Sequence, residues 1–296
     1  MSEYKRAFDY HVHEKHSSDA AGMSIRDVVK TAEARRIDEV AFTTHMITGG
    51  IDQGFGIQPE EIPEYLDEIL DAQEGTDVAL RVGLEIDYFP EEERNIERAL
   101  AEYPFDFILG SVHRVHGLSI ASKGEATQFF SGRPLRESIN EYLGVWNQAI
   151  ESGLFDVMAH PDYFKKYLPS LGYPILTFED FTPTIYDSFD RLASYNIGFE
   201  INTSSTRHGS GTFFPVKDFV REARQAGVKT ITVGSDTHVP ETLGFNIPEA
   251  LDLLDKSGFG EVSVFRGRKR TGVLLEDLKV RGHKDEEALM MPQLPA

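Results

Sequence analysis

Histidines lie at the ends of several short apolar runs in this chain. Six of its ten histidines do so: His11, His13, His45, His113, His160 and His238. Neutral imidazole nitrogens bind divalent metals, and catalytic residues of a β/α barrel collect at the carboxyl ends of its strands. An isolated histidine of this kind is more often a hydrogen-bonded core or surface residue. Six of them on five predicted strands indicate a metal centre.

The first predicted strand ends in His11-Val12-His13. Alternation along a strand places both imidazoles on one side of the sheet, so that two nitrogens can bind one ion. This motif alone is a weak signal, and its position gives it weight. Asp9, two residues earlier, is expected on the same side, where it could orient an imidazole as a hydrogen-bond acceptor.

Two acidic residues, Glu85 and Asp87, end the third predicted strand. A carboxylate has two oxygens and can bridge two metals, and Glu85 is the preferred bridge because it lies nearer the strand. Asp87 could instead be solvated or structural. The alternative for Glu85 is an ion pair with an arginine such as Arg81 or Arg114.

Asp236 and His238 repeat the two-residue spacing after Gly234, and both face one basin if the strand continues that far. The candidate ligands therefore exceed what one ion can use, and two or three divalent ions are expected. Nitrogen and oxygen ligands suit Zn, Mn and Fe alike, and the absence of cysteine excludes thiolate sites. The nine candidates are His11, His13, Asp19, His45, Glu85, His113, His160, Asp236 and His238.

Composition narrows the class of partner. The net charge of -19, from 49 acidic and 30 basic side chains, repels polyanions, so nucleic acid is not expected to bind. Neither a signal peptide nor a run of about 18 apolar residues is found, which predicts a cytoplasmic protein without a membrane partner. A small-molecule substrate fits this composition, whereas the oligomeric state stays open.

The metal candidates need a scaffold, and strands alternate with helices along the chain. This order predicts a parallel sheet, either open or closed into a barrel. An open sheet predicts a GxGxxG loop after an early strand, which is not found, so a barrel is favoured. The predicted strands are 7–13, 39–46, 80–89, 105–112, 155–159, 197–201 and 230–234, and the predicted helices are 24–36, 59–73, 91–102, 135–152, 178–195, 215–225 and 248–256. One α/β domain over 1–280 and a polar tail over 281–296 are expected.

Seven ordered motifs resemble the polymerase and histidinol phosphatase (PHP) superfamily, most closely its monofunctional histidinol-phosphatases. They are DYHVH at 9–13, FTTH at 42–45, GLEIDYF at 83–89, GSVH at 110–113, AHPDYFKKY at 159–167, FEINTSSTR at 199–207 and GSDTH at 234–238.

The resemblance implies a distorted (β/α)7 TIM-like barrel with a trinuclear site. One ion would take His11, His13, Glu85 and Asp236, a second Glu85, His113 and His160, and a third Asp19, His45 and His238. His16 is an alternative to Asp19 as a ligand, and the spacing after the first motif favours Asp19. Thr44 replaces an acid that is common before the second-motif histidine of the family. This difference concerns the tuning of the ligands by the residues behind them, and not ligation itself.

The predicted activity is metal-dependent hydrolysis of a phosphate monoester, L-histidinol phosphate to L-histidinol and phosphate, in histidine biosynthesis. Arg207 is expected to hold the phosphate, with Lys165 and Lys166 as weaker candidates and Ser111 and Asn202 as hydrogen-bonding groups. Asp19 or His238 would assist the departing alkoxide.

Other activities remain open at this point. They are PHP hydrolysis of a sugar phosphate or nucleotide and a non-catalytic metal-binding scaffold. An amidohydrolase is disfavoured because it would carry a lysine where this chain has Ser111-Val112-His113.

Overall fold

The computed structural model describes residues 4, 6–208 and 211–279. The predicted polar tail over 281–296 lies outside the described residues, and the domain boundary at 280 stays a prediction. No helix in the described part of the chain is long and apolar enough to cross a membrane.

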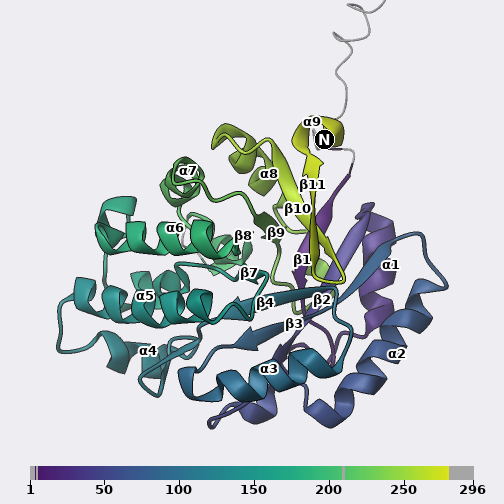
Figure 1. The fold of residues 1–296 in the computed structure, drawn as a ribbon, viewed down its shortest axis with the longest axis horizontal. Helices are drawn as coiled ribbons and strands as arrows, with labels where there is room; N and C mark the ends of the chain where they lie inside the picture. The colour runs from purple at the N-terminus through teal and green to yellow at the C-terminus, as the bar shows by residue number, and fades with distance from the viewer. Residues whose placement is uncertain (1–3, 5, 209–210, 280–296) are drawn as a thin grey trace, which may run out of the picture.

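Seven parallel strands form a nearly closed barrel in which each strand pairs with the next one along the chain (Figure 1). A parallel bridge between Val12 and Thr237 joins the first strand to the segment that follows the last one. The backbone amide of His13 donates to the carbonyl of Thr237 at 3.0 Å across this seam. The predicted distorted seven-unit barrel is therefore confirmed. Its strands are β1 (Phe8–Val12), β2 (Glu39–Met46), β3 (Ala79–Asp87), β4 (Phe107–Ser111), β7 (Val157–Met158), β8 (Gly198–Asn202) and β9 (Ile231–Gly234).

Helices cover the outside of the barrel, as Figure 1 shows, and a helix was predicted at each of these seven places. Local signals set their ends. Ser24 caps α1 and forms a reciprocal capping box with Asp27, while Gly153 ends α5 in the left-handed conformation. The seven helices are α1 (Ile25–Arg35), α2 (Ile62–Gln73), α3 (Glu93–Glu102), α5 (Leu135–Ser152), α6 (Thr184–Tyr195), α7 (Lys217–Gln225) and α8 (Ile247–Lys256).

Four further strands and two further α-helices were not predicted. Two of them pair as a hairpin after β4, namely β5 (Arg114–Val115) and β6 (Leu118–Ser119), and α4 (Lys123–Phe130) follows them. A second hairpin, β10 (Glu261–Arg266) and β11 (Lys269–Leu274), leads into α9 (Leu275–Leu278). Its turn residues Gly267 and Arg268 both have positive φ, which is typical of a tight type I′ hairpin.

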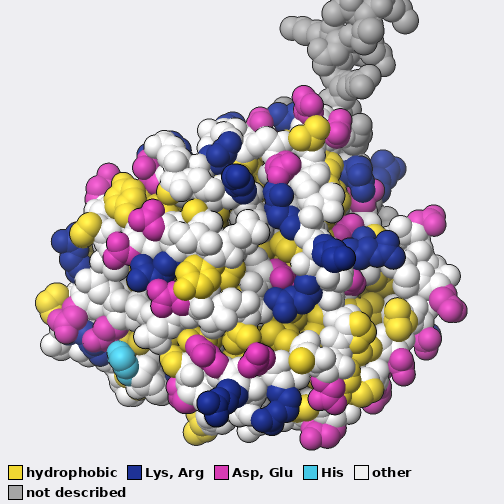
Figure 2. Space-filling model, in the orientation of Figure 1, with side chains coloured by type: hydrophobic (Ala, Val, Ile, Leu, Met, Phe, Trp, Pro, Cys, Tyr) yellow, Lys and Arg dark blue, Asp and Glu magenta, His cyan; other side chains and the backbone are white. Residues whose placement is uncertain are grey.

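The hairpin β10–β11 closes the amino end of the barrel. Gly267 donates its backbone amide to the Asp106 carboxylate, and Arg268 pairs with Asp156 at 3.1 Å, so the turn is bound to residues that precede β4 and β7. Behind the turn, Phe265 packs against Phe107 of β4 with ring centroids 5.0 Å apart. Figure 2 shows Lys and Arg side chains gathered over this hairpin. The opposite, carboxyl end of the barrel is therefore the end left open for a site.

Removing the Arg268 guanidinium should destabilise the fold. Arg268→Ala leaves the nearly buried Asp156 carboxylate without its cation, and we expect the free energy of unfolding to fall by about 2 kcal/mol. This is less than for a fully buried pair, because Arg268 is 33% exposed. Urea unfolding followed by circular dichroism would measure the loss.

The loss should depend on pH. Burial already raises the pKa of Asp156 despite Arg268, and removal of the guanidinium would raise it further. The native variant then holds a proton that the unfolded chain has released, so its deficit grows as the pH rises above the usual carboxyl range and shrinks in acid. A deficit that stays constant with pH would contradict this reading of the pair.

Candidate metal centre

A β-bulge in β1 directs the first pair of histidines into the barrel. The register with β2 shifts between Asp9 and Val12, which breaks the alternation just before His11. His11 and His13 are both fully buried, and their Nε2 atoms lie 3.0 Å apart. Both rings therefore present a nitrogen to one point, as the spacing predicted.

Asp9 does not orient an imidazole, and this prediction was wrong. Because of the bulge, its carboxylate turns away from the His11 ring and accepts hydrogen bonds from the Ser235 amide at 2.8 Å and the Gly244 amide at 2.8 Å. The acceptor for the Nδ1 atom of His11 is Glu200 of β8, at 2.8 Å. Glu200 lies within the quoted FEINTSSTR motif and alternates with apolar residues in a buried strand, which is the signal that could have identified it.

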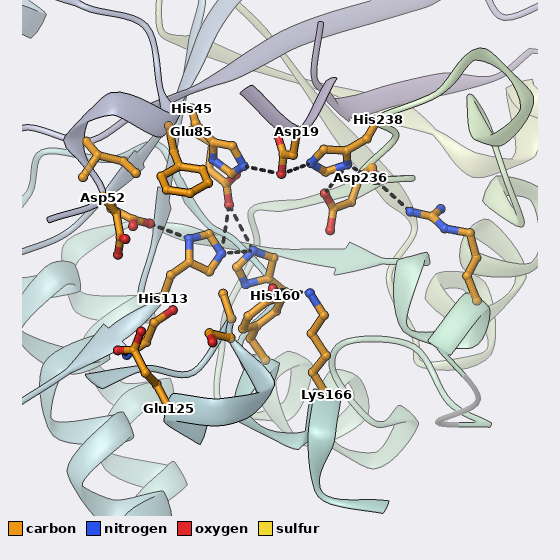
Figure 3. Close-up of a pocket in the computed structure, with 18 of the residues that line it drawn as sticks. Asp19, His45, Asp52, Glu85, His113, Glu125, His160, Lys166, Asp236 and His238 are labelled. Carbon is orange, nitrogen blue, oxygen red and sulfur yellow. Dashed lines mark hydrogen bonds and ion pairs between the residues drawn. The ribbon is translucent and has the colours of Figure 1, made fainter. Parts of the chain in front are cut away.

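The Glu85 carboxylate lies at the centre of the site. Its Oε2 atom is 3.3 Å from His11 Nε2 and 3.0 Å from His45 Nδ1, while its Oε1 atom is 3.0 Å from His160 Nε2. Each oxygen thus faces a different set of nitrogens, which is the arrangement expected of a bridging ligand. Figure 3 shows Glu85 between His45 and the His113–His160 pair.

The arginine alternative for Glu85 is excluded by the geometry. Arg81 pairs with Glu39 at 2.9 Å, and Arg114 pairs with Asp52 and with Glu125. Asp87 is structural, as one alternative held, because it accepts from His113 Nδ1 at 2.5 Å and from the Ser111 hydroxyl at 2.7 Å.

Asp19 reaches the basin, whereas His16 does not. The Asp19 carboxylate is 3.1 Å from His238 Nε2 and 3.7 Å from His45 Nε2. His16 instead pairs with Glu14 at 2.9 Å and packs edge-on against Tyr65. The structure thus brings together Asp19, rather than His16, with the other candidates.

Asp236 and His238 share the basin, but not through strand alternation. β9 ends at Gly234, and Asp236 has φ of +54°, so the condition that the strand continues to His238 is not met. The turn still aims the Asp236 carboxylate at His13 Nε2, 3.4 Å away. Gly234 itself is required, because a Cβ there would collide with the Glu200 carboxylate and the His11 Cβ.

Three overlapping groups of these side chains could each hold an ion, since the ligand atoms within each group lie within 4.8 Å of one another. We call them the inner, far and mouth groups. The inner group is His11, His13 and Asp236, the far group is His45, Glu85 and His113, and the mouth group is His13, His45 and His238.

The electrostatics of the site also fit divalent cations. Burial opposes charge, yet the imidazoles of His11 and His45 hold the pKa of Glu85 well below its usual value. Burial likewise opposes protonation of His45, but Glu85 and Asp19 raise its pKa to about 10. Burial and the facing rings of His238 and His45 lower the pKa of His13 well below its usual value. Ionised carboxylates among crowded imidazoles that cannot all be protonated are a donor set for metal ions.

A cavity of about 650 Å³ opens over these groups. Glu85, His113, His160 and Asp236 line its floor, and Lys166 and Arg207 also face it. Figure 3 shows the Lys166 side chain reaching towards His160.

The other predicted phosphate ligands lie elsewhere. Of the two candidate lysines, Lys165 does not line the cavity, because its ammonium is buried against Asp162 at 2.7 Å and against the Phe213 carbonyl. Ser111 and Asn202 are fully buried and are not among the cavity-lining residues. Asn202 donates towards Glu200 and Asp236, at 3.1 and 3.3 Å, so both residues support ligands instead of facing the cavity.

Comparison with known proteins agrees with this geometry. The PHP domain model matches residues 9–204, about two thirds of the chain, and the chain therefore belongs to the PHP domain family. A probable histidinol-phosphatase of Deinococcus radiodurans is 28% identical over 88% of this chain and 97% of its own length.

Two solved structures share the fold. A histidinol phosphate phosphatase of Lactococcus lactis, crystallised with zinc, L-histidinol and phosphate, superposes with a TM-score of 0.77 at 25% identity, covering 90% of this chain and 98% of that one. A putative histidinol phosphatase of Listeria monocytogenes has a TM-score of 0.70 at 20% identity over 80% of this chain and 97% of that one, and it supports the fold. The predicted resemblance is thus confirmed.

Removing metal should destabilise the wild-type protein. Without cations, the buried carboxylates lose their counter-charges and the imidazole nitrogens lose their shared partner, so a chelator should lower the melting temperature by several degrees. Glu85→Gln keeps the size of the side chain but removes the central charge, and we expect this variant to carry little metal and to respond weakly to the chelator. Differential scanning calorimetry and elemental analysis would test both expectations.

His116→Ala provides the matched control, because His116 is 63% exposed, pairs with Glu141 at 3.6 Å and belongs to none of the three candidate ligand groups. It should retain the wild-type metal content and the wild-type response. Equal metal content in wild type and Glu85→Gln would rule out the assigned centre.

Proposed function

We propose that this protein hydrolyses phosphate monoesters at a cluster of two or three divalent ions, with L-histidinol phosphate as its substrate and L-histidinol and phosphate as products. The observation that carries the proposal is the two-sided Glu85 carboxylate, with imidazoles of separate strands facing each oxygen. The named activity of the relatives and the ligands of the Lactococcus structure support the choice of ester.

The inner and far groups, with His160 beside Glu85, would hold two ions, and the mouth group with Asp19 would hold a third. Zn, Mn and Fe all suit these nitrogen and oxygen ligands. When bound, such ions polarise phosphoryl oxygens and activate water. Carboxylates behind the rings, Glu200 behind His11 and Asp87 behind His113, fix the tautomers that leave Nε2 free to ligate.

Cationic side chains on one side of the cavity suit the phosphate group. The Lys166 ammonium donates to the Tyr163 hydroxyl at 2.7 Å and lies over two tyrosine rings, which fix it at the cavity wall. Arg207 is held by the carbonyls of Ser235 and Asp236, both at 2.7 Å, and also lines the cavity. These two groups would orient a dianionic ester over the metal ligands.

Acidic side chains on another part of the cavity wall suit a cationic substrate. Asp52 and Glu125 both line the cavity, and Arg114 binds both of them from outside the lining, so one of the two negative charges is not neutralised. Figure 3 shows these carboxylates on the His113 side, across the cavity from Lys166. A substrate with a phosphate at one end and an ammonium at the other matches this polarity better than a sugar phosphate, which has no ammonium group.

The proton for the departing alkoxide would come from Asp19 or His238, the more exposed of the candidate residues. Asp19 is 49% exposed and His238 is 27% exposed, so their 3.1 Å contact lies where solvent can exchange protons with the site. We propose that this pair assists the leaving oxygen when two ions are bound and neither side chain ligates a third.

The decisive assay compares phosphate esters on the metal-replete protein. We expect L-histidinol phosphate to exceed sugar phosphates and nucleotides in kcat/KM by at least about tenfold. Glu85→Ala and His113→Ala should each lose about three orders of magnitude or more, because an ion loses a ligand that no other residue can replace. A hundredfold preference for another ester would remove the named substrate, and unimpaired variants would remove the site. Absence of turnover on every ester would favour a metal-binding scaffold.

Two variants should separate the two ends of the substrate. Glu125→Gln keeps the side-chain shape but removes one charge contact with the ammonium group, so it should lower kcat/KM for L-histidinol phosphate about tenfold. The kcat/KM for an aryl phosphate without an ammonium group should not change. Lys166→Met should lower kcat/KM for both esters about tenfold or more, because both carry phosphate. Equal effects of Glu125→Gln on the two esters would contradict the assignment of the acidic wall.

A further inference from the structure

Ser17 is a fully buried hydroxyl that touches the metal centre from behind. Its Oγ atom lies 3.2 Å from His13 Nδ1 and 2.8 Å from the Thr44 hydroxyl, and it accepts the backbone amide of His45 at 2.9 Å. Ser17 also precedes the 3-10 turn Ser18–Ala20, which carries Asp19. One hydroxyl thus joins the segments that supply three candidate ligands.

The direction of these hydrogen bonds follows from the donors. The His45 amide can only donate, and the His13 ring donates from Nδ1 when its Nε2 atom faces the carboxylates of Glu85 and Asp236. Ser17 Oγ then accepts two hydrogen bonds and must donate its own proton to Thr44. The result is a neutral relay from the imidazole to Ser17 and on to Thr44.

The hydrogen-bond acceptor at His13 Nδ1 differs in type from those at the neighbouring rings. His11 and His113 donate to carboxylates, namely Glu200 and Asp87, whereas His13 donates to a hydroxyl. A carboxylate behind a ring raises its basicity as a ligand, and a hydroxyl does so less. Thr44 carries no charge, so the relay stays neutral.

We propose that Ser17 and Thr44 are positioning residues that align His13 with His45 and set the affinity of the ion held by the mouth group. The proposal rests on the metal cluster put forward above, but it does not depend on which ester is hydrolysed. His13 and His45 are the two members of the mouth group that Ser17 contacts, so its loss should release that ion first.

The test measures metal affinity in the full-length protein by competition with a chelator, using Zn²⁺ and, for the visible spectrum, Co²⁺. Ser17→Ala should weaken one ion of the cluster by about 10 to 100-fold, leave the others bound, and alter the Co²⁺ absorption bands. Wild-type affinity for every ion in this variant would overturn the proposal.

A matched pair at Thr44 separates the relay from packing. Thr44→Val keeps the shape and removes the acceptor, so it should weaken the same ion, whereas Thr44→Ser keeps the acceptor and should restore most of the affinity. Equal losses in the two variants would show that only packing matters and would overturn the proposal, even if Ser17→Ala fails to fold. Glu85→Gln separates failure of this proposal from failure of the metal centre, because wild-type metal content in that variant would reject the centre itself.

Discussion

The contact on which the site depends is that of one buried carboxylate, Glu85, with imidazoles from several strands. Burying an ionised carboxylate is costly unless positive charge surrounds it, and crowding imidazoles is costly unless their nitrogens have a shared partner. The carboxylates and the imidazoles therefore offset only part of each other's cost in free energy. Cations between them would satisfy both, and the surrounding barrel fixes the positions of the side chains that would hold them.

The barrel achieves this by bringing strand ends together while departing from regularity where a ligand requires it. The bulge in β1 allows both histidines of the first motif to face inward, and the left-handed turn at Asp236 directs a carboxylate back from a loop. Gly234 leaves the space in which Glu200 reaches His11. The amino end is closed by the hairpin β10–β11, so the irregular backbone lies mainly at the end that carries the chemistry.

Much of this could be predicted from the sequence, because apolar runs and helical spacing report which elements form, and motif order reports which strand ends meet. All seven barrel strands and the ligand candidates were identified in this way. The orienting acceptors were not, since Asp9 and Glu200 are both acids in buried strands and only the bulge decides which one faces an imidazole. Lys165 and Lys166 could not be told apart for a similar reason, because a short 3-10 turn directs the two side chains to different partners and only Lys166 lines the cavity.

The cavity combines two polarities that do not follow from the net charge of -19. An acidic surface would by itself repel a phosphate ester, so the local cations must outweigh it at short range, where screening by salt is weakest. Lys166 and Arg207 line one cavity with most of the candidate ligands, and the acidic pair Asp52 and Glu125 lies across it. Because Arg114 ties both acids together, a change at any of the three would alter the wall as a unit, and selectivity for a cationic alcohol would arise from that fixed wall rather than from overall charge.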